Sequence, residues 1–227
     1  MADHSHTFAN SLSNPMPTIA LTFDDGPWPD GTPKLLDVLG AGGVKATFFV
    51  WGQQASEHRE IVRRTLESGH SVQPHCWTHR SHRDMSPQQI RSDIDEVTSL
   101  LRELGAPSPQ LWRPPWGHWL VGATRELASD RGLALAGWTI DATDYAGTTA
   151  TVMHRNVVAA LDEAARDSSD AVVLMHDSPL EPGQWEKRQN INDTVELVRR
   201  LVADESRRFS ALAHGLWNNL VPVNSRR

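Results

Sequence analysis

Residues Thr18–Pro27 read TIALTFDDGP, a short apolar run followed by two adjacent aspartates and a turn. The run through Phe23 is short and β-branched, which is typical of a buried strand, and Gly26-Pro27 ends it. Neighbouring carboxylates repel each other, so Asp24 and Asp25 are unfavourable side by side unless a cation lies between them or they serve separate tasks. The alternative is an Asx turn that only closes the strand, because Asp-Asp-Gly-Pro is also good turn chemistry.

Outward from this stretch, strand and helix patterns alternate along the chain. The predicted strands are 18–23, 46–51, 70–74, 110–113, 133–140, 171–175 and 209–213. The predicted helices are 33–40, 57–68, one that begins at Ser86, 122–131, 151–165 and 191–203. Seven strands separated by helices imply a parallel sheet with helical crossovers, either closed into a barrel or open and doubly wound.

The helix that begins at Ser86 has the most complete set of signals. Ser86 is a good N-cap, Pro87 suits the first helical position, and Gln89 completes a capping box. Apolar residues then recur at helical spacing, at Ile90, Ile94, Val97, Leu101 and Leu104. The pattern predicts an amphipathic helix that packs one face on the core.

The composition limits the possible partners. Of 227 residues, 39% are hydrophobic and 22% are charged, which favours a single domain. Residues 1–17 and 215–227 are expected to be terminal tails. A net charge of −6 offers no basic field, so we expect no nucleic acid partner. No apolar stretch approaches the roughly 18 residues of a membrane span, so we expect no membrane partner. The first residues lack a secretory signal pattern, which predicts a cytoplasmic protein as the sequence stands, or a secreted one if a leader has been removed.

Chemically distinctive polar residues follow the ends of five predicted strands. In chain order they are Asp24, Asp25, His75, His79, Arg113, Asp141, Asp144, His176 and Asp177. In a (β/α) barrel all of them would face the carboxyl-end rim, where active sites are built. Loops are generally polar, which explains part of this pattern. It does not explain why the polar residues are aspartates, histidines and an arginine.

His75 and His79 form an i, i+4 pair within the sequence HCWTH. If the segment is helical or tightly looped, both imidazoles lie on one side and suit a first-row metal such as zinc. A surface histidine pair without a metal is the alternative. Two histidines and one carboxylate leave a position open for water or substrate, the pattern of a catalytic site. Cys76 is a poor candidate for a further ligand, since adjacent residues rarely both reach one metal.

These segments resemble the five ordered motifs of the polysaccharide deacetylases, the NodB-homology proteins of carbohydrate esterase family 4. The motifs are TFDDGP at 22–27, HCWTH at 75–79, RPPWG at 113–117, DATDY at 141–145 and LMHD at 174–177. Five motifs in the family's order and at compatible spacing are specific, and the similarity covers residues 18–214. The resemblance implies an α/β fold, a distorted (β/α)7 barrel, which agrees with the seven strands counted independently.

The resemblance also implies catalytic and metal-binding roles. Asp24 would be the general base, and Asp25, His75 and His79 would hold one divalent metal, zinc in the first place with cobalt or nickel as alternatives. The metal would act as a Lewis acid on the acetamide carbonyl and lower the pKa of a water molecule toward about 7. His176 would be the general acid that protonates the departing amine.

Other motif residues would support these groups and bind substrate. By resemblance, Arg113 would position the base, and Asp144 would pair with Arg113. The backbone N–H of Trp116 would stabilise the oxyanion. Leu174 would line a small pocket for the acetate methyl group, and Pro114 would belong to the substrate-binding wall.

The sequence departs from the family pattern at three positions. Cys76 stands where the family usually has Ser or Thr, and it is a weaker hydrogen-bond partner for the loop. Trp116 replaces the usual Tyr but keeps its backbone N–H. Tyr145, a predicted substrate-binding residue, replaces the usual Trp and removes bulk beside His176. No catalytic or ligand position is missing, so we expect an active enzyme, with Asp141 and Asp177 in supporting roles.

Three functional hypotheses follow. The first is a metal-dependent hydrolase that removes acetyl groups from N-acetylated or O-acetylated sugars, such as chitooligosaccharides, peptidoglycan or acetylxylan. The absent signal sequence and short loops favour a soluble oligosaccharide or small metabolite as partner. The second is an intracellular amidase for a small N-acyl compound or cyclic imide, although such relatives often alter the first-motif aspartates. The third is a non-catalytic carbohydrate-binding module, which the intact catalytic positions disfavour.

Overall fold

Strand β1 (Thr18–Asp24) lies in the middle of the main sheet, between β2 (Thr47–Trp51) and β7 (Ala171–His176). The computed structural model describes residues 17–118, 121–179 and 190–212. Every residue of β1 after Thr18 is buried. This burial on both faces explains why the strand is continuously apolar rather than alternating.

All strand pairs are parallel. The main sheet has the order β3-β2-β1-β7-β6, strand β8 also pairs with the first residues of β1, and β4 and β5 form a separate pair. The remaining strands are β3 (Ser71–Cys76), β4 (Leu111–Trp112), β5 (Ala134–Leu135), β6 (Ile140–Asp141) and β8 (Arg208–Phe209). The predicted α/β arrangement of parallel strands is confirmed. Among the described residues, however, the strands pair as two sheets rather than as one closed ring.

The predicted strand 133–140 was wrong in detail, because the segment forms two short strands in different sheets. β5 pairs with β4, whereas Thr139, directly before β6, donates its N–H to a carbonyl of β7 at 2.9 Å. Between the two strands, the carbonyls of Ala136 and Gly137 accept hydrogen bonds from the Arg113 guanidinium at 3.2 and 2.8 Å. The buried Arg113 side chain thus supplies the hydrogen-bond donors that a neighbouring strand would supply to these two carbonyls.

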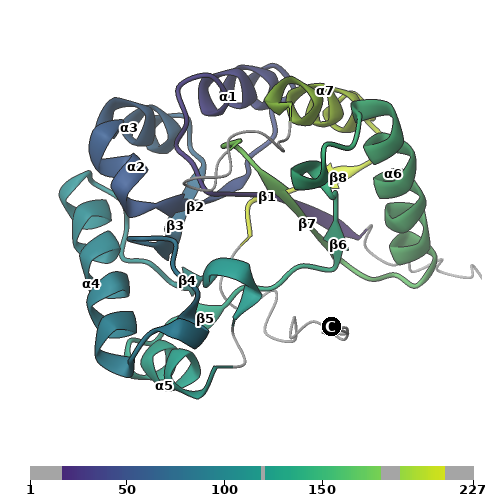
Figure 1. Cartoon of the computed structure of the whole chain (residues 1–227). Coiled ribbons are helices and arrows are strands. Elements are labelled where there is room, and N and C mark those ends of the chain that lie inside the picture. Colours follow the sequence, from purple (N-terminus) through teal and green to yellow (C-terminus); the bar gives the residue numbers. More distant parts are fainter. Residues whose placement is uncertain (1–16, 119–120, 180–189, 213–227) are drawn as a thin grey trace, which may run out of the picture.

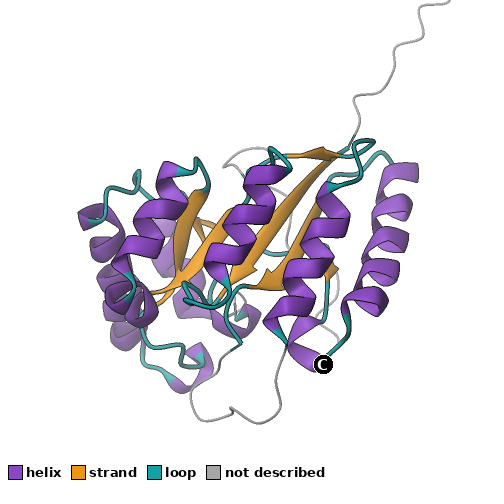
Figure 2. Ribbon diagram, turned by 90° about the horizontal axis from the view of Figure 1, so that it is seen from above, coloured by secondary structure: helices purple, strands orange, loops and turns teal. Residues whose placement is uncertain are grey.

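Helices surround the strands on the outside of the fold (Figure 1 and Figure 2). They are α1 (Thr32–Ala41), α2 (Gly52–Glu57), α3 (Arg59–Glu67), α4 (Pro87–Glu103), α5 (Gly122–Asp130), α6 (Ala150–Arg166) and α7 (Ile191–Val202). The predicted helix 57–68 corresponds to α3, and α2 was not predicted. A Cβ on Gly52, the first residue of α2, would lie 2.4 Å from the Trp77 ring, so close packing favours a glycine at this position.

The predicted capping box of α4 is present. The Ser86 side chain accepts from the Gln89 N–H at 3.3 Å, and the Gln89 side chain accepts from the Ser86 N–H at 2.8 Å. The predicted apolar positions are buried, and the same helix face also buries one carboxylate, Asp93. That buried charge has a specific partner, described below.

The main core fills the space between the strands and the helices. Its fully buried aromatic residues include Phe23 and Phe48 of neighbouring strands, whose rings stack with centroids 5.0 Å apart. None of the helices in the described part of the chain has the length and apolar character needed to cross a bilayer.

Candidate active site

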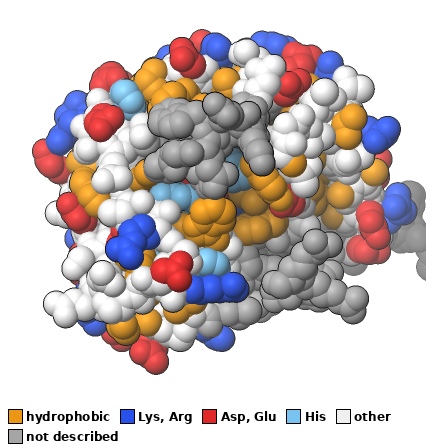
Figure 3. All heavy atoms as spheres, viewed as in Figure 1, with side chains coloured by type: hydrophobic (Ala, Val, Ile, Leu, Met, Phe, Trp, Pro, Cys, Tyr) orange, Lys and Arg blue, Asp and Glu red, His pale blue; other side chains and the backbone are white. Residues whose placement is uncertain are grey.

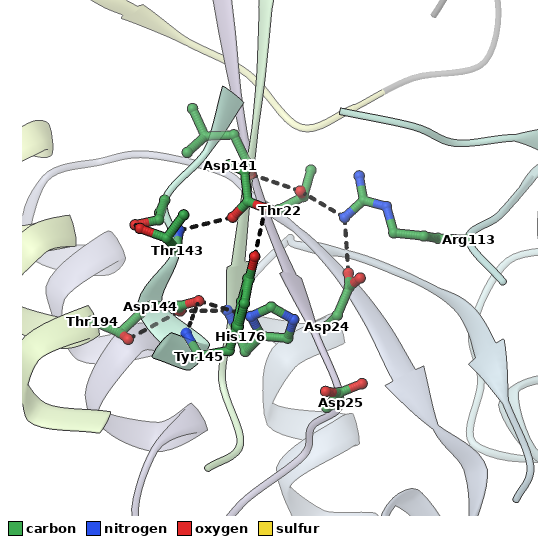
Figure 4. Close-up of polar contacts among 12 residues, drawn as sticks. Thr22, Asp24, Asp25, Arg113, Asp141, Thr143, Asp144, Tyr145, His176 and Thr194 are labelled. Atoms are coloured by element: carbon green, nitrogen blue, oxygen red, sulfur yellow. Dashed lines mark hydrogen bonds and ion pairs between the residues drawn. The ribbon is translucent and has the colours of Figure 1, made fainter. Parts of the chain in front are cut away.

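The predicted polar residues gather where the carboxyl ends of the parallel strands meet. Figure 4 shows Asp24 and Asp25 at the end of β1, with Arg113 and His176 beside them. In the sheet register, Asp24 lies opposite His176 of β7. The fold therefore brings together side chains from strands that are far apart in the sequence.

Asp25, His75 and His79 bring potential ligand atoms together. The Nε2 atoms of His75 and His79 lie 3.2 and 3.0 Å from Asp25 Oδ1. One ligand atom from each residue lies within 4.8 Å of the others. A tetrahedral zinc ion with bonds of about 2.0–2.1 Å separates its ligand atoms by about 3.3 Å. The spacing of this predicted ligand group therefore fits a first-row divalent metal.

The surroundings of Asp25 also fit a cation. Its Oδ1 atom is buried and makes no hydrogen bond of normal geometry to a described residue, which is unfavourable without a compensating positive charge. Burial by itself would raise the pKa of Asp25, but His79 and His75 hold that pKa well below its usual range. The carboxylate is therefore ionised and suited to a metal. Cys76 is not part of the ligand group, and burial raises the pKa of its thiol.

Arg113 holds Asp24 from the interior. Its Nη1 donates to Asp24 Oδ1 and to Thr22 Oγ1, both at 2.8 Å, and its other donors reach two backbone carbonyls. The side chain is fully buried, and its guanidinium carbon lies 4.2 Å from the centre of the Phe49 ring. The geometry agrees with the predicted role of Arg113 in positioning Asp24, because the guanidinium is held from several directions.

The predicted pairing of Asp144 with Arg113 was wrong. Asp144 Oδ1 lies 2.8 Å from His176 Nδ1, and its Oδ2 accepts from the His176 backbone N–H at 2.8 Å and the Thr194 hydroxyl at 3.1 Å. The hydrogen bonds of Arg113 go instead to the acceptors named above. Asp144 begins the short turn η3 (Asp144–Ala146), which packs against the end of β7 rather than against β4.

Asp144 therefore determines the orientation and charge of His176. An ionised carboxylate can only accept hydrogen bonds, so Nδ1 carries the shared proton and Nε2 is the nitrogen that can act on a substrate. Burial disfavours the charged imidazole, but Asp144, assisted by Asp25 and Asp24, raises the pKa of His176 to about 10. A cation beside Asp25 would offset part of this negative field and lower the pKa again.

Two exposed aromatic side chains flank the site. Trp116 is 54% exposed and its ring centroid lies 5.5 Å from that of His79. Tyr145 is 51% exposed and stands edge-on to His176 at 5.6 Å. Figure 3 shows hydrophobic and histidine side chains together near the centre of the face turned to the viewer. Flat aromatic faces in this position can pack on sugar rings.

The other predicted substrate-binding positions lie close by. The Trp116 backbone N–H donates to no other group in the described residues, so it is available to a substrate oxygen. Pro114 is buried directly before the turn that carries Trp116. Leu174 is buried in β7, opposite Thr22 of β1. The binding roles of these residues stay predictions.

Asp141 and Asp177 support the loops at the rim. Asp141 accepts from the Thr143 N–H at 2.8 Å and from the Tyr145 hydroxyl at 3.2 Å. Asp177 accepts from the Thr32 hydroxyl at 2.6 Å, and burial raises the pKa of its carboxyl to about 7. Both arrangements agree with the supporting roles expected from the sequence.

The sequence analysis did not identify the residues that support the loop carrying the predicted ligands His75 and His79. Asp93 of α4 binds the backbone of the segment between His75 and His79, and the Trp51 ring lies 5.2 Å from the His79 ring. One signal was available for Asp93: a carboxylate stands next to Ile94 on the apolar face of an otherwise regular amphipathic helix.

Comparison with known proteins agrees with this geometry. The sequence model of the polysaccharide deacetylase family matches residues 12–136. A peptidoglycan-N-acetylglucosamine deacetylase of Bacillus cereus is 32% identical over 161 residues, which is 71% of this chain and 56% of the relative. A chitooligosaccharide deacetylase of Bradyrhizobium sp. is 33% identical over 188 residues, 81% of each chain.

Solved structures show the same fold. The crystal structure of a peptidoglycan N-acetylglucosamine deacetylase in complex with 4-naphthalen-1-yl-N-oxidanyl-benzamide has a TM-score of 0.73 to this chain. The two are 28% identical, and the match covers 86% of each chain. This chain spans a little over half the length of the Bacillus cereus relative.

Proposed function

Because this chain belongs to the polysaccharide deacetylase family, we propose that it is a metal-dependent hydrolase that removes acetyl groups from N-acetylated sugars. The names of its relatives favour N-acetylglucosamine units, either in chitooligosaccharides or in the glycan of peptidoglycan. The chitooligosaccharide deacetylase aligns over 81% of both chains.

One observation carries the proposal. A carboxylate held by a buried arginine, Asp24, and an imidazole held by a buried carboxylate, His176, lie opposite each other in the register of β1 and β7. The ligand group of Asp25, His75 and His79 adjoins them. A candidate base and a candidate acid thus lie on neighbouring strands beside a metal-ligand group, an arrangement suited to metal-assisted amide hydrolysis.

Each residue has a task in the proposed reaction. A divalent metal held by Asp25, His75 and His79 would supply Lewis acidity toward the amide carbonyl and toward water. Asp24, held by Arg113, takes the proton of the attacking water. The Trp116 N–H donates to the carbonyl oxygen as it gains negative charge. His176 gives the proton of its Nε2 to the departing amine nitrogen, while Asp144 stabilises the charged ring before transfer.

The test is acetate release by zinc-reconstituted protein from chitooligosaccharides, peptidoglycan fragments, acetylxylan and small N-acetyl compounds. We expect release from an N-acetylated sugar, and loss of activity on chelation. Asp24→Asn should lower kcat by about 10²–10⁴-fold, the usual contribution of a positioned base. Asp130→Asn, which neutralises an exposed carboxylate on α5, is the matched control and should retain the wild-type rate.

Two results would contradict the proposal. Folded, zinc-loaded protein that releases acetate from no sugar but cleaves a small amide would indicate the amidase function instead. If Asp24→Asn releases acetate at the wild-type rate, Asp24 does not act as the general base.

A further inference from the structure

Asp93 binds the loop that carries the metal-ligand histidines. Its Oδ2 accepts from the Trp77 backbone N–H at 2.6 Å, and its Oδ1 accepts from the backbone N–H and the hydroxyl of Thr78 at 3.0 and 2.7 Å. The carboxylate belongs to α4 and is only 6% exposed. A single buried side chain therefore satisfies three donors in the segment between His75 and His79.

The same loop is held from its other side by β2 and α2. The Trp77 carbonyl accepts from the Trp51 indole N–H at 2.8 Å and from the Gln53 backbone N–H at 3.3 Å. The Trp77 ring packs so closely on Gly52 that a Cβ there would lie 2.4 Å away. Trp77 is thus fixed through its carbonyl by β2 and α2, and through its N–H by Asp93 of α4.

The residue that follows this clamped segment has a strained backbone. His79 has φ of 52°, in the left-handed region that non-glycine residues rarely adopt. Such a conformation is unfavourable for a residue other than glycine and persists only when surrounding contacts impose it. The hydrogen bonds of Asp93 hold the two residues directly before His79, whose Nε2 lies 3.0 Å from Asp25 Oδ1.

We propose that Asp93 is a positioning residue for metal binding: it holds Trp77 and Thr78 so that His75 and His79 converge on Asp25. This assignment rests on the proposed function only in requiring that the three ligands bind a metal. Charged acceptors make stronger hydrogen bonds than neutral ones, so a carboxylate suits three donors on one loop. An amide would offer one oxygen and oppose one backbone N–H with its own NH₂.

The test measures metal affinity without substrate. Zinc dissociation constants are determined by competition with a chromophoric chelator, at a temperature where circular dichroism shows each variant folded. Asp93→Asn should raise the zinc dissociation constant about 10–100-fold, as loss of a residue that orients metal ligands typically does. Its cobalt complex should also show an altered visible absorption spectrum. Asp93→Glu keeps the charge and should restore part of the affinity.

Asp95→Asn is the matched control. Asp95 lies on the same helix and pairs with Arg131 at the surface, so its variant changes the same charge without touching the loop, and it should bind zinc like the wild type. If Asp93→Asn does not fold, Thr78→Val removes only the hydroxyl bond and should still weaken zinc binding several-fold. Wild-type zinc affinity in a folded Asp93→Asn or Thr78→Val protein would overturn the assignment. Wild-type protein that binds zinc but releases no acetate would instead overturn only the proposed function.

Discussion

At the scale of single residues, each carboxylate of the site has a different partner and so a different task. Asp24 is bound by an arginine, Asp25 faces two histidines, and Asp144 bonds to His176. The adjacent pair Asp24 and Asp25 is tolerated because the two side chains point to separate partners, Asp24 to Arg113 and Asp25 to the two histidines. Separate environments are how one site can hold a base and keep an acid protonated.

Replacing Asp144 with Asn should shift the pH dependence of the reaction. Asp144 raises the pKa of His176, so its loss lowers that pKa and deprotonates the acid at lower pH. The alkaline limb of kcat/KM should move to lower pH, and kcat should fall by about 10²-fold or more as the imidazole loses its orientation. A pH–rate profile over the alkaline range measures both effects.

Thr194→Val is the control for this experiment. This variant removes one hydrogen bond to Asp144 but keeps the carboxylate that raises the pKa of His176, so the alkaline limb should stay at the same pH. If the alkaline limb of kcat/KM stays at the same pH in Asp144→Asn, the ionisation of a group other than His176 determines that limb.

Gly26 of the first motif is required by packing against Asp177. A Cβ at this position would lie 2.0 Å from Asp177 Oδ2, so Gly26→Ala should destabilise the protein by about 1–3 kcal/mol, as overpacking typically does. Urea denaturation measures the loss. Gly40→Ala in α1 is the control, because nothing lies within 4 Å of the added methyl group, and it should be neutral or stabilising. Equal stability of the two variants would show that the Asp177 side chain moves aside.

At the scale of elements, the loops after the strands store conformational strain at the site. Of the five non-glycine residues with positive φ among those described, four lie in these loops, and Ser168 lies elsewhere. The four are Asp25, His79, Trp116 and Thr143, with φ of 75°, 52°, 58° and 56°. Two of them are predicted metal ligands, and a third, Trp116, is the predicted N–H donor to the oxyanion. The rigid strands beneath the loops allow these unfavourable conformations to persist.

Helix α4 packs on the core and carries Asp93, so the capping of its N-terminus affects both the stability of the fold and the position of Asp93. Ser86→Ala removes the N-cap and should lower the free energy of unfolding by about 0.5–2 kcal/mol. Gln88→Ala, at an exposed position in the first turn with no capping bond, is the matched control and should change stability little. The urea midpoints of the two variants are compared. Equal midpoints would mean that the N-cap contributes nothing and that tertiary packing alone determines where α4 begins.

At the scale of the whole molecule, the candidate ligands come from the ends of β1 and β3, which β2 separates in the main sheet, so a bound metal should stabilise the entire fold. Zinc at about 100 times its dissociation constant adds about 2.7 kcal/mol to the folded state, and chelation removes it. The thermal midpoint should rise with zinc in the wild type and in His154→Ala, which alters a histidine of α6. It should not rise in His79→Ala. A wild-type thermal midpoint that changes neither with added zinc nor with chelator would contradict the metal site.

Much of the fold was predictable because its signals are local. The apolar runs around Phe23, Phe48 and Val173 have only one good environment, a buried parallel strand, and the capping box of α4 lies within four residues of sequence. The candidate ligands were also predictable, since parallel strands place their carboxyl ends at one edge.

The amino-acid sequence by itself determined the alternation of strands and helices, and the selection of residues at the rim. Only the tertiary structure decided which of those residues pair: that His176 rather than Arg113 bonds to Asp144, and that Asp93 holds the histidine loop. The physical reason is range. Strand, cap and turn preferences act between neighbours in the chain, whereas a buried charge is satisfied by whichever group the completed fold brings within about 3 Å of it.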